Sequence, residues 1–134
     1  MSRLTALIIV LPALLLTGCS LSGTVVDRSE FAVQVGKMQL AGDPALKVYH
    51  GGALHLIPLE SIKTLEIDGE ESMNYGGEFF MSASITLKDG TRKVASGRNS
   101  DKRSFVSVNN TITGKSSNGV YSISVDNIIR LEVD

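Results

Sequence analysis

The sequence predicts an all-β domain, and three observations support this class. Apolar and polar residues alternate with the period of two that a half-buried strand requires, most clearly from Glu78 to Leu87. Turn signals separate such segments, and past residue 30 no stretch of ten residues has helical spacing. We therefore expect residues 30–134 to form a single small antiparallel β-barrel or β-sandwich of about eight to ten short strands.

The predicted strands follow one another in order along this domain. Residues 31–35 place three apolar side chains on one strand face, and residues 46–49 open a second short apolar segment. The "HGGA" of residues 50–53 is typical of a hairpin with a two-residue loop. The "KDGT" of residues 88–91 predicts another hairpin turn, and the "SNG" of residues 117–119 marks a third.

Two similar segments, residues 57–68 and 123–134, align without a gap. Each copy predicts a strand, one tight helical turn and a second strand, with Leu65 and Leu131 directed inward. Gene duplication explains the likeness, and so does the local physics of a strand–turn–strand unit. Five of the twelve aligned positions are identical: Ile57/Ile123, Ile62/Ile128, Leu65/Leu131, Glu66/Glu132 and Asp68/Asp134.

This order of extended segment, 3₁₀ turn and closing strand resembles the corner before the last strand of small Src-homology-type barrels. The resemblance covers about a dozen residues of each copy. It implies a small barrel or sandwich and no particular ligand.

Residues 1–18 have the three-part plan of a signal peptide. Arg3 supplies the charge, an uncharged run extends from Leu4 to Leu16, and two small residues follow. The run has 13 residues, whereas a membrane-spanning helix needs about 20. The sequence Leu16-Thr17-Gly18-Cys19 then resembles the lipobox of bacterial lipoproteins. A plain secretory signal, or a cysteine buried in a core helix, is the alternative interpretation.

The lipoprotein resemblance implies that residues 1–18 are removed and that Cys19 becomes the lipidated first residue, carrying acyl chains such as palmitate. It also implies a cell-envelope location. The residue after the cysteine is Ser20 and not Asp, which by the same resemblance favours the outer membrane, facing the periplasm. Residues 19–29 are polar and rich in small residues, so we expect the lipidated cysteine and a flexible tether there.

Two histidines are weak candidates for a metal site. If Gly51-Gly52 is a hairpin loop, His50 and His55 become diagonal neighbours on one face of the hairpin. A zinc site usually needs three or four ligands, and no third is identifiable, so solvated or half-buried histidines are the simpler interpretation. We expect no metal and no cofactor.

An acidic segment, "EIDGEES" at residues 66–72, invites comparison with a calcium-binding loop. It lacks the D-x-[DN]-x-[DN]-G spacing of a known calcium loop, so a charged hairpin turn is the expectation.

A basic segment follows this acidic one along the chain. Residues 88–103 carry six cations and two Asp. A loop with this charge fits lipid headgroups, phosphates or an acidic partner, and a simple solvated loop is the alternative. The candidate interaction residues are Arg92, Lys93, Arg98, Lys102 and Arg103.

The composition argues against several functional classes. The net charge of −1 gives no reason to expect nucleic acid as a partner. No motif of a hydrolase, metalloprotease or phosphate-binding loop occurs, so we expect no enzyme. The prediction is a lipid-anchored envelope protein that contacts another envelope protein or peptidoglycan. A module that binds a soluble ligand, such as a lysozyme inhibitor, is the alternative; a metal-dependent hydrolase built on His50 and His55 is a third hypothesis.

Overall fold

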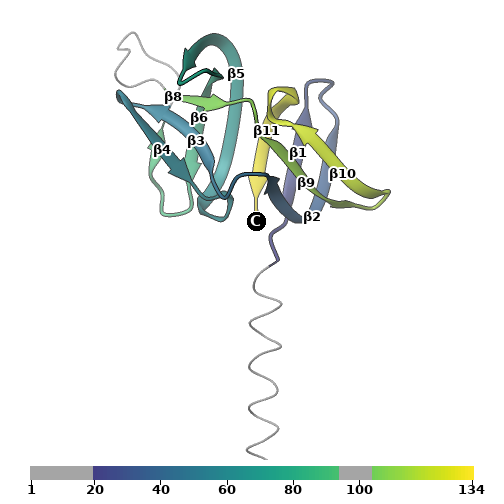
Figure 1. Ribbon diagram of the computed structural model, residues 1–134. Helices are drawn as coiled ribbons and strands as arrows, with labels where there is room; N and C mark the ends of the chain where they lie inside the picture. Colours follow the sequence, from purple (N-terminus) through teal and green to yellow (C-terminus); the bar gives the residue numbers. More distant parts are fainter. Residues whose placement is uncertain (1–19, 94–103) are drawn as a thin grey trace, which may run out of the picture.

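The computed structural model describes residues 20–93 and 104–134 of the 134-residue chain. This part of the chain is all-β, as predicted, and holds eleven strands and two 3₁₀ turns (Figure 1). The elements are β1 (Gly23–Asp27), β2 (Ala32–Ala41), β3 (Leu46–His50), β4 (Ala53–Ile57), η1 (Leu59–Ser61), β5 (Ile62–Tyr75), β6 (Glu78–Leu87), β7 (Arg92–Lys93), β8 (Ser104–Ser107), β9 (Thr111–Ser116), β10 (Gly119–Ser124), η3 (Val125–Asn127) and β11 (Ile128–Val133).

The strands form one antiparallel sheet in the order β10-β9-β2-β1-β11-β5-β6-β8-β3-β4, with β7 paired to β6. The sheet is not closed, because β10 and β4 end this path. It bends into two lobes: the first lobe holds β1, β2, β9, β10 and β11, and the second holds β3 to β8 (Figure 1). In each lobe a hairpin, β9–β10 or β3–β4, folds over the other strands.

The two lobes meet where β11 pairs with β5, and the internal repeat lies at this junction. Leu131 pairs with Leu65, and its neighbours Arg130 and Glu132 pair with Glu66 and Thr64. Since the two leucines are equivalent in the repeat, the lobes are related by an approximate half-turn about this pair. Arg130 also donates hydrogen bonds to Glu66 and Glu132 across the outer face of the junction.

The predicted strand–turn–strand units are both present, as β4–η1–β5 and β10–η3–β11. The structural repeat is longer than the sequence likeness. The β3–β4 hairpin pairs Leu46 with Ile57, and the β9–β10 hairpin pairs Ile112 with Ile123, each residue 66 positions later. The equivalence therefore covers residues 46–68 and 112–134.

The three predicted hairpin turns are confirmed. His50 pairs with Ala53 across Gly51-Gly52, and both glycines have positive φ. Ser116 pairs with Gly119 at the turn between β9 and β10. At residues 88–91 the Leu87 N–H donates to Thr91 O at 2.8 Å, which closes the turn between β6 and β7.

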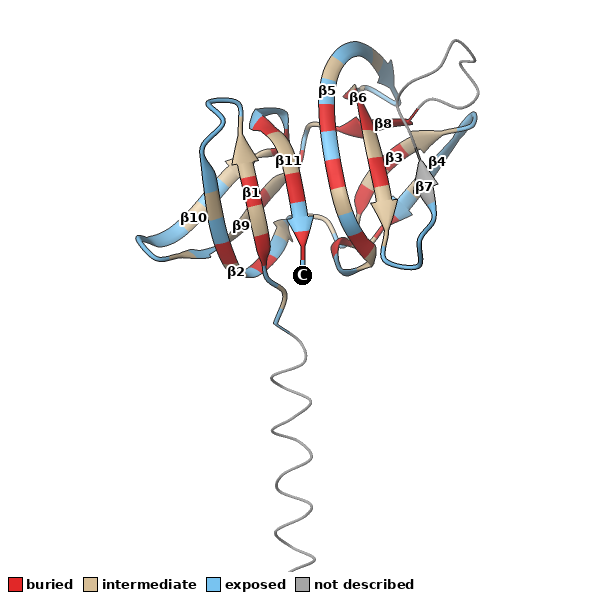
Figure 2. Ribbon diagram, turned by 180° about the vertical axis from the view of Figure 1, so that it is seen from behind, coloured by how far each residue is buried: buried red, intermediate tan, exposed pale blue. Residues whose placement is uncertain are grey.

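A continuous hydrophobic core runs through both lobes, visible as the buried positions that alternate along the strands (Figure 2). Leu65, Ile67 and Leu131 are buried as the alternation predicted, while Glu66 and Glu132 are exposed. The core therefore includes the junction, and packing holds the two lobes together.

The prediction of a tether over residues 19–29 is wrong for most of that range. Gly23–Asp27 is strand β1, which pairs with β2 on one side and β11 on the other, and Val25 is completely buried. The domain therefore begins before residue 30. The short "TVV" segment is a central strand because it pairs with residues 32–35, which follow it closely, and also with residues 128–133, which lie more than 100 residues later.

The prediction of a hairpin turn within residues 66–72 is also wrong. Strand β5 continues through this segment, and its register with β6 shifts between Ile67 and Ser72, as in a β-bulge. Gly69 has a φ of 65°, which a glycine adopts without strain. The true hairpin turn is Gly76-Gly77, since Tyr75 pairs with Glu78.

Candidate interaction surface

The base of the domain, defined here as Ser20–Ser22 with Asp134, is where the described chain begins and ends (Figure 1). The Met38 N–H donates to Leu21 O at 2.7 Å. The Asp134 N–H donates to Ser22 O at 2.9 Å, and the Ser22 hydroxyl donates to the Asp134 carboxylate at 3.0 Å. Backbone hydrogen bonds therefore fix Leu21 and Ser22 to the rest of the domain. Leu16-Thr17-Gly18-Cys19, the segment that resembles a lipobox, lies outside the described residues.

An open groove of about 580 Å³ lies at this base. Its apolar lining includes Leu21, Met38, Leu40 and Leu59. Two carboxylates also line the groove, those of Asp43 and Glu60. Because Ser20 also lines the groove, it is next to the position at which a lipid on Cys19 would join the chain.

The two candidate histidines lie close together, on neighbouring strands of the β3–β4 hairpin. Their ring centroids are 6.3 Å apart. His50 Nδ1 lies 2.5 Å from Ser104 Oγ, and His55 Nε2 lies 3.3 Å from His50 O. Within residues 20–93 and 104–134 no group of three His, Cys, Asp or Glu side chains is placed to hold a metal ion. The hydrogen bonds give both rings a structural role.

The acidic segment is organised by its bulge. Ser82, which is buried, donates a hydrogen bond from its hydroxyl to Asp68 and accepts one from the Glu71 N–H at 3.1 Å. Asp68 also accepts the Glu70 N–H at 3.0 Å. These contacts give hydrogen-bond acceptors to the Glu70 and Glu71 N–H groups where the β5–β6 pairing is interrupted. The Asp68 carboxylate therefore stabilises the bulge.

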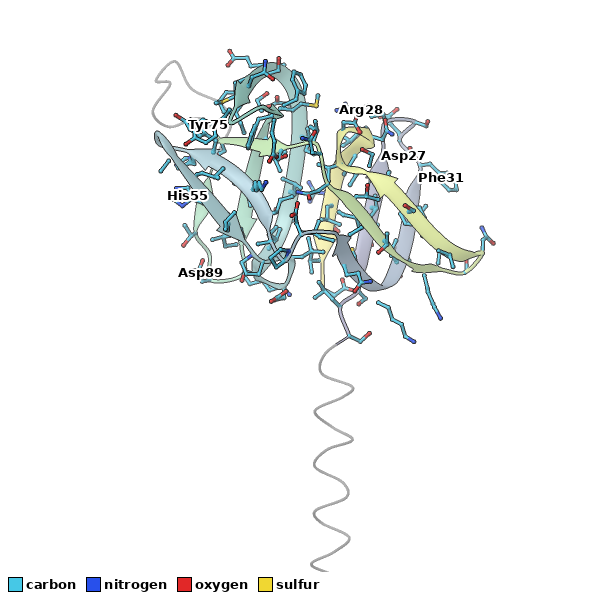
Figure 3. The ribbon with its side chains drawn as sticks, viewed as in Figure 1. Asp27, Arg28, Phe31, His55, Tyr75 and Asp89 are labelled. Atoms are coloured by element: carbon cyan, nitrogen blue, oxygen red, sulfur yellow. The ribbon has the colours of Figure 1, made fainter. Side chains whose placement is uncertain are left out.

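Beyond the bulge, β5 and β6 form an arm whose aromatic residues pack on β3. The Tyr75 ring centroid lies 5.0 Å from that of Tyr49 and 6.4 Å from that of Phe80. Tyr75 remains partly exposed on the second lobe (Figure 3). These ring contacts explain why Phe80 is buried although it faces away from the main core.

An ion pair fixes the tip of the same arm, next to the Gly76-Gly77 turn, to β3. Lys47 Nζ lies 2.5 Å from Glu78 Oε1, and the Ser107 hydroxyl donates to Glu78 Oε2 at 2.8 Å. The hydrogen bond from Lys47, followed by that from Ser107, lowers the pKa of Glu78. The hydrogen bond to Glu78 in turn raises the pKa of Lys47.

The predicted basic surface falls mostly outside the described residues. Arg92 and Lys93 form strand β7, which pairs with β6 beside Ile85 and Thr86. Arg98, Lys102 and Arg103 belong to residues 94–103, which lie outside the described part. Strand β8, which follows them, pairs with the same strand β6.

The sequence reasoning missed the two free edges of the sheet. Strand β4 pairs with β3 and strand β10 pairs with β9, and neither has a second partner among the described strands. Leu56 on β4 is 62% exposed, Leu54 is 39% exposed, and Val120 on β10 is 87% exposed. A usable signal was present in the sequence, since the segments "ALHLI" and "GVYSIS" contain no charged residue.

Comparison with known proteins assigns no family: none of the family models matches the chain, and no curated protein matches it. Over residues 20–93 and 104–134, the structure contains no helix with the length and apolar character needed to cross a membrane.

Proposed function

We propose that this chain is a lipid-anchored cell-envelope protein that acts through protein–protein contacts and not through catalysis. The lipobox supports the anchor, and the observation that carries the proposal is the short distance between Cys19 and the folded domain. Leu21 is already hydrogen-bonded to Met38. Two residues span at most about 7 Å, whereas the predicted tether of 11 residues would span about 36 Å.

A lipid on Cys19 would therefore hold the base of the domain directly at the membrane surface. Each buried methylene contributes about 0.8 kcal/mol, so two or three acyl chains on one cysteine give slow release. A domain held this closely keeps its base toward the membrane in every copy. The β5–β6 arm lies at the end of the domain opposite the position where the chain enters at Ser20, and the edge strands β4 and β10 run along its two sides (Figure 1).

The remaining surface supports a binding role. In the described part of the chain His50 and Asp68 serve the fold, through their hydrogen bonds with Ser104 and Ser82. Five of the six large exposed apolar side chains of the described residues lie on the edge strands or on the arm, and the sixth, Phe31, lies between β1 and β2. Exposed apolar positions on strand edges are typical of sites that add a strand from another chain.

The proposal is tested by fractionation of cells that express the full chain or Cys19→Ala. We expect the full chain in the membrane fraction, extracted by detergent and not by high salt, and the variant in the soluble fraction. Equal distribution of both chains would overturn the anchor. Inhibition of a lysozyme by the purified full chain, unchanged in the edge variant Leu56→Lys, would instead support the soluble-ligand alternative.

A further inference from the structure

The two free edges of the sheet are complementary to each other. Leu54 on β4 and Val120 on β10 occupy equivalent positions of the structural repeat, 66 residues apart. Both are exposed. Natural sheets usually protect such edges with charges, proline or bulges, and neither β4 nor β10 contains a charged residue or a proline. The edges are therefore suited to strand pairing.

The directions of the two edge strands determine how copies can meet. The lobes are related by a half-turn about the Leu65–Leu131 pair, so β4 and β10 run in opposite directions at the two ends of the sheet. When two copies stand in the same orientation, β4 of one copy thus meets β10 of the next as an antiparallel pair. A shared orientation is what short anchoring to one membrane would impose. Pairing of β4 with a second β4 would require the two copies to be inverted.

We infer that the partner is a second copy of this chain, whose β10 pairs antiparallel with β4 and extends the sheet head to tail along the membrane. This inference deepens the proposed function and rests on it for the common orientation. Registers that pair repeat-equivalent residues, as the central junction does, include the one that sets His55 opposite Tyr121 of the next copy, and we choose it because it covers the most exposed apolar side chains. Leu56 then faces Val120 of that copy, and two exposed apolar side chains cover each other.

The contact is heterologous, so it leaves a free β4 edge at one end and a free β10 edge at the other, and further copies can add. Each edge is short, with five residues in β4 and six in β10. Such a small contact is weak between freely diffusing molecules. Confinement to a membrane raises the effective concentration of the edges, so assembly belongs to the anchored protein.

Cysteine crosslinking in membranes tests this arrangement, because Cys19 is the only native cysteine and is blocked when lipidated. Cells express the full chain as the double variant Leu56→Cys/Val120→Cys, and the membranes are treated with a short thiol-specific crosslinker. We expect a ladder of dimers, trimers and longer species from the double variant. Each single variant alone should give monomers, and a mixture of the two single variants should give dimers without longer species.

Two controls keep the outcomes separate. The variant Lys63→Cys, exposed on a strand inside the sheet, reports random collision and should give no ladder. The parental chain reports Cys19: a crosslinked dimer of the parental chain would mean a free thiol and would overturn the anchor, not the edge contact. A ladder no stronger than that of Lys63→Cys, or a dimer from Leu56→Cys alone, would overturn the head-to-tail pairing.

Discussion

Replacement of Leu131 by alanine should destabilise both lobes together. Leu131 is completely buried and pairs with its repeat equivalent Leu65 at the centre of the sheet. The substitution removes three carbon atoms, worth about 2.4 kcal/mol at 0.8 kcal/mol for each buried methylene. A cavity in a packed core adds to this, so we expect the free energy of unfolding to fall by about 3 to 4 kcal/mol. Leu65→Ala should cost a similar amount.

Urea denaturation of the purified full chain, monitored by circular dichroism and tyrosine fluorescence, measures this effect. Tyr49 and Tyr75 report on the second lobe and Tyr121 on the first, and the chain contains no tryptophan. All signals should move to lower urea in one shared transition. Separate transitions, or a shift seen by Tyr121 alone after isolation of its signal, would refute the continuous core. The exposed-site variant Lys63→Ala should change the unfolding free energy by less than about 0.5 kcal/mol.

Three further predictions follow from individual side chains. Gly23→Val should destabilise the chain by about 1 to 3 kcal/mol in urea denaturation, because a Cβ at Gly23 overlaps the Glu132 carbonyl oxygen. A loss of unfolding free energy no larger than that of Ser20→Val would contradict the assignment of β1. Glu78 has a lowered pKa, so it stabilises the fold at neutral pH, and this contribution is lost as the pH falls through that pKa. Glu78→Gln should therefore unfold at a lower urea concentration at pH 7, and its unfolding free energy should depend less on pH in the acid range. An unchanged pH dependence of the unfolding free energy would count against the ion pair. The buried side-chain amide of Asn110 makes no hydrogen bond with the described residues, so Asn110→Leu should raise the unfolding free energy by about 1 to 2 kcal/mol. A decrease of similar size would mean that the side-chain amide has a polar partner.

Local patterns predicted much of the fold. Alternation identified β6, and the glycine-containing turns identified three hairpins, because both features depend on neighbouring residues. The inward direction of Leu65 and Leu131 also followed from a period of two. The repeat correctly indicated two strand–turn–strand units.

The errors came from contacts between distant residues. Gly23–Asp27 looks like a tether until its partner β11, more than 100 residues later, is known. The acidic segment looks like a turn because nothing local shows that Ser82 stabilises the bulge at Asp68. The free edges were missed for the same reason, since the position of a strand at the end of a sheet is a property of the whole topology.

We propose above all that Cys19 carries a lipid and holds the domain at a membrane, two residues before the first backbone hydrogen bond of the described chain. Intact-mass spectrometry of the chain purified from cell membranes tests this claim most directly. We expect a chain that begins at Cys19, lacks residues 1–18, and carries the added mass of a thioether-linked diacylglycerol, with or without an N-acyl group. A chain that retains residues 1–18, or that has an unmodified Cys19, would contradict the claim.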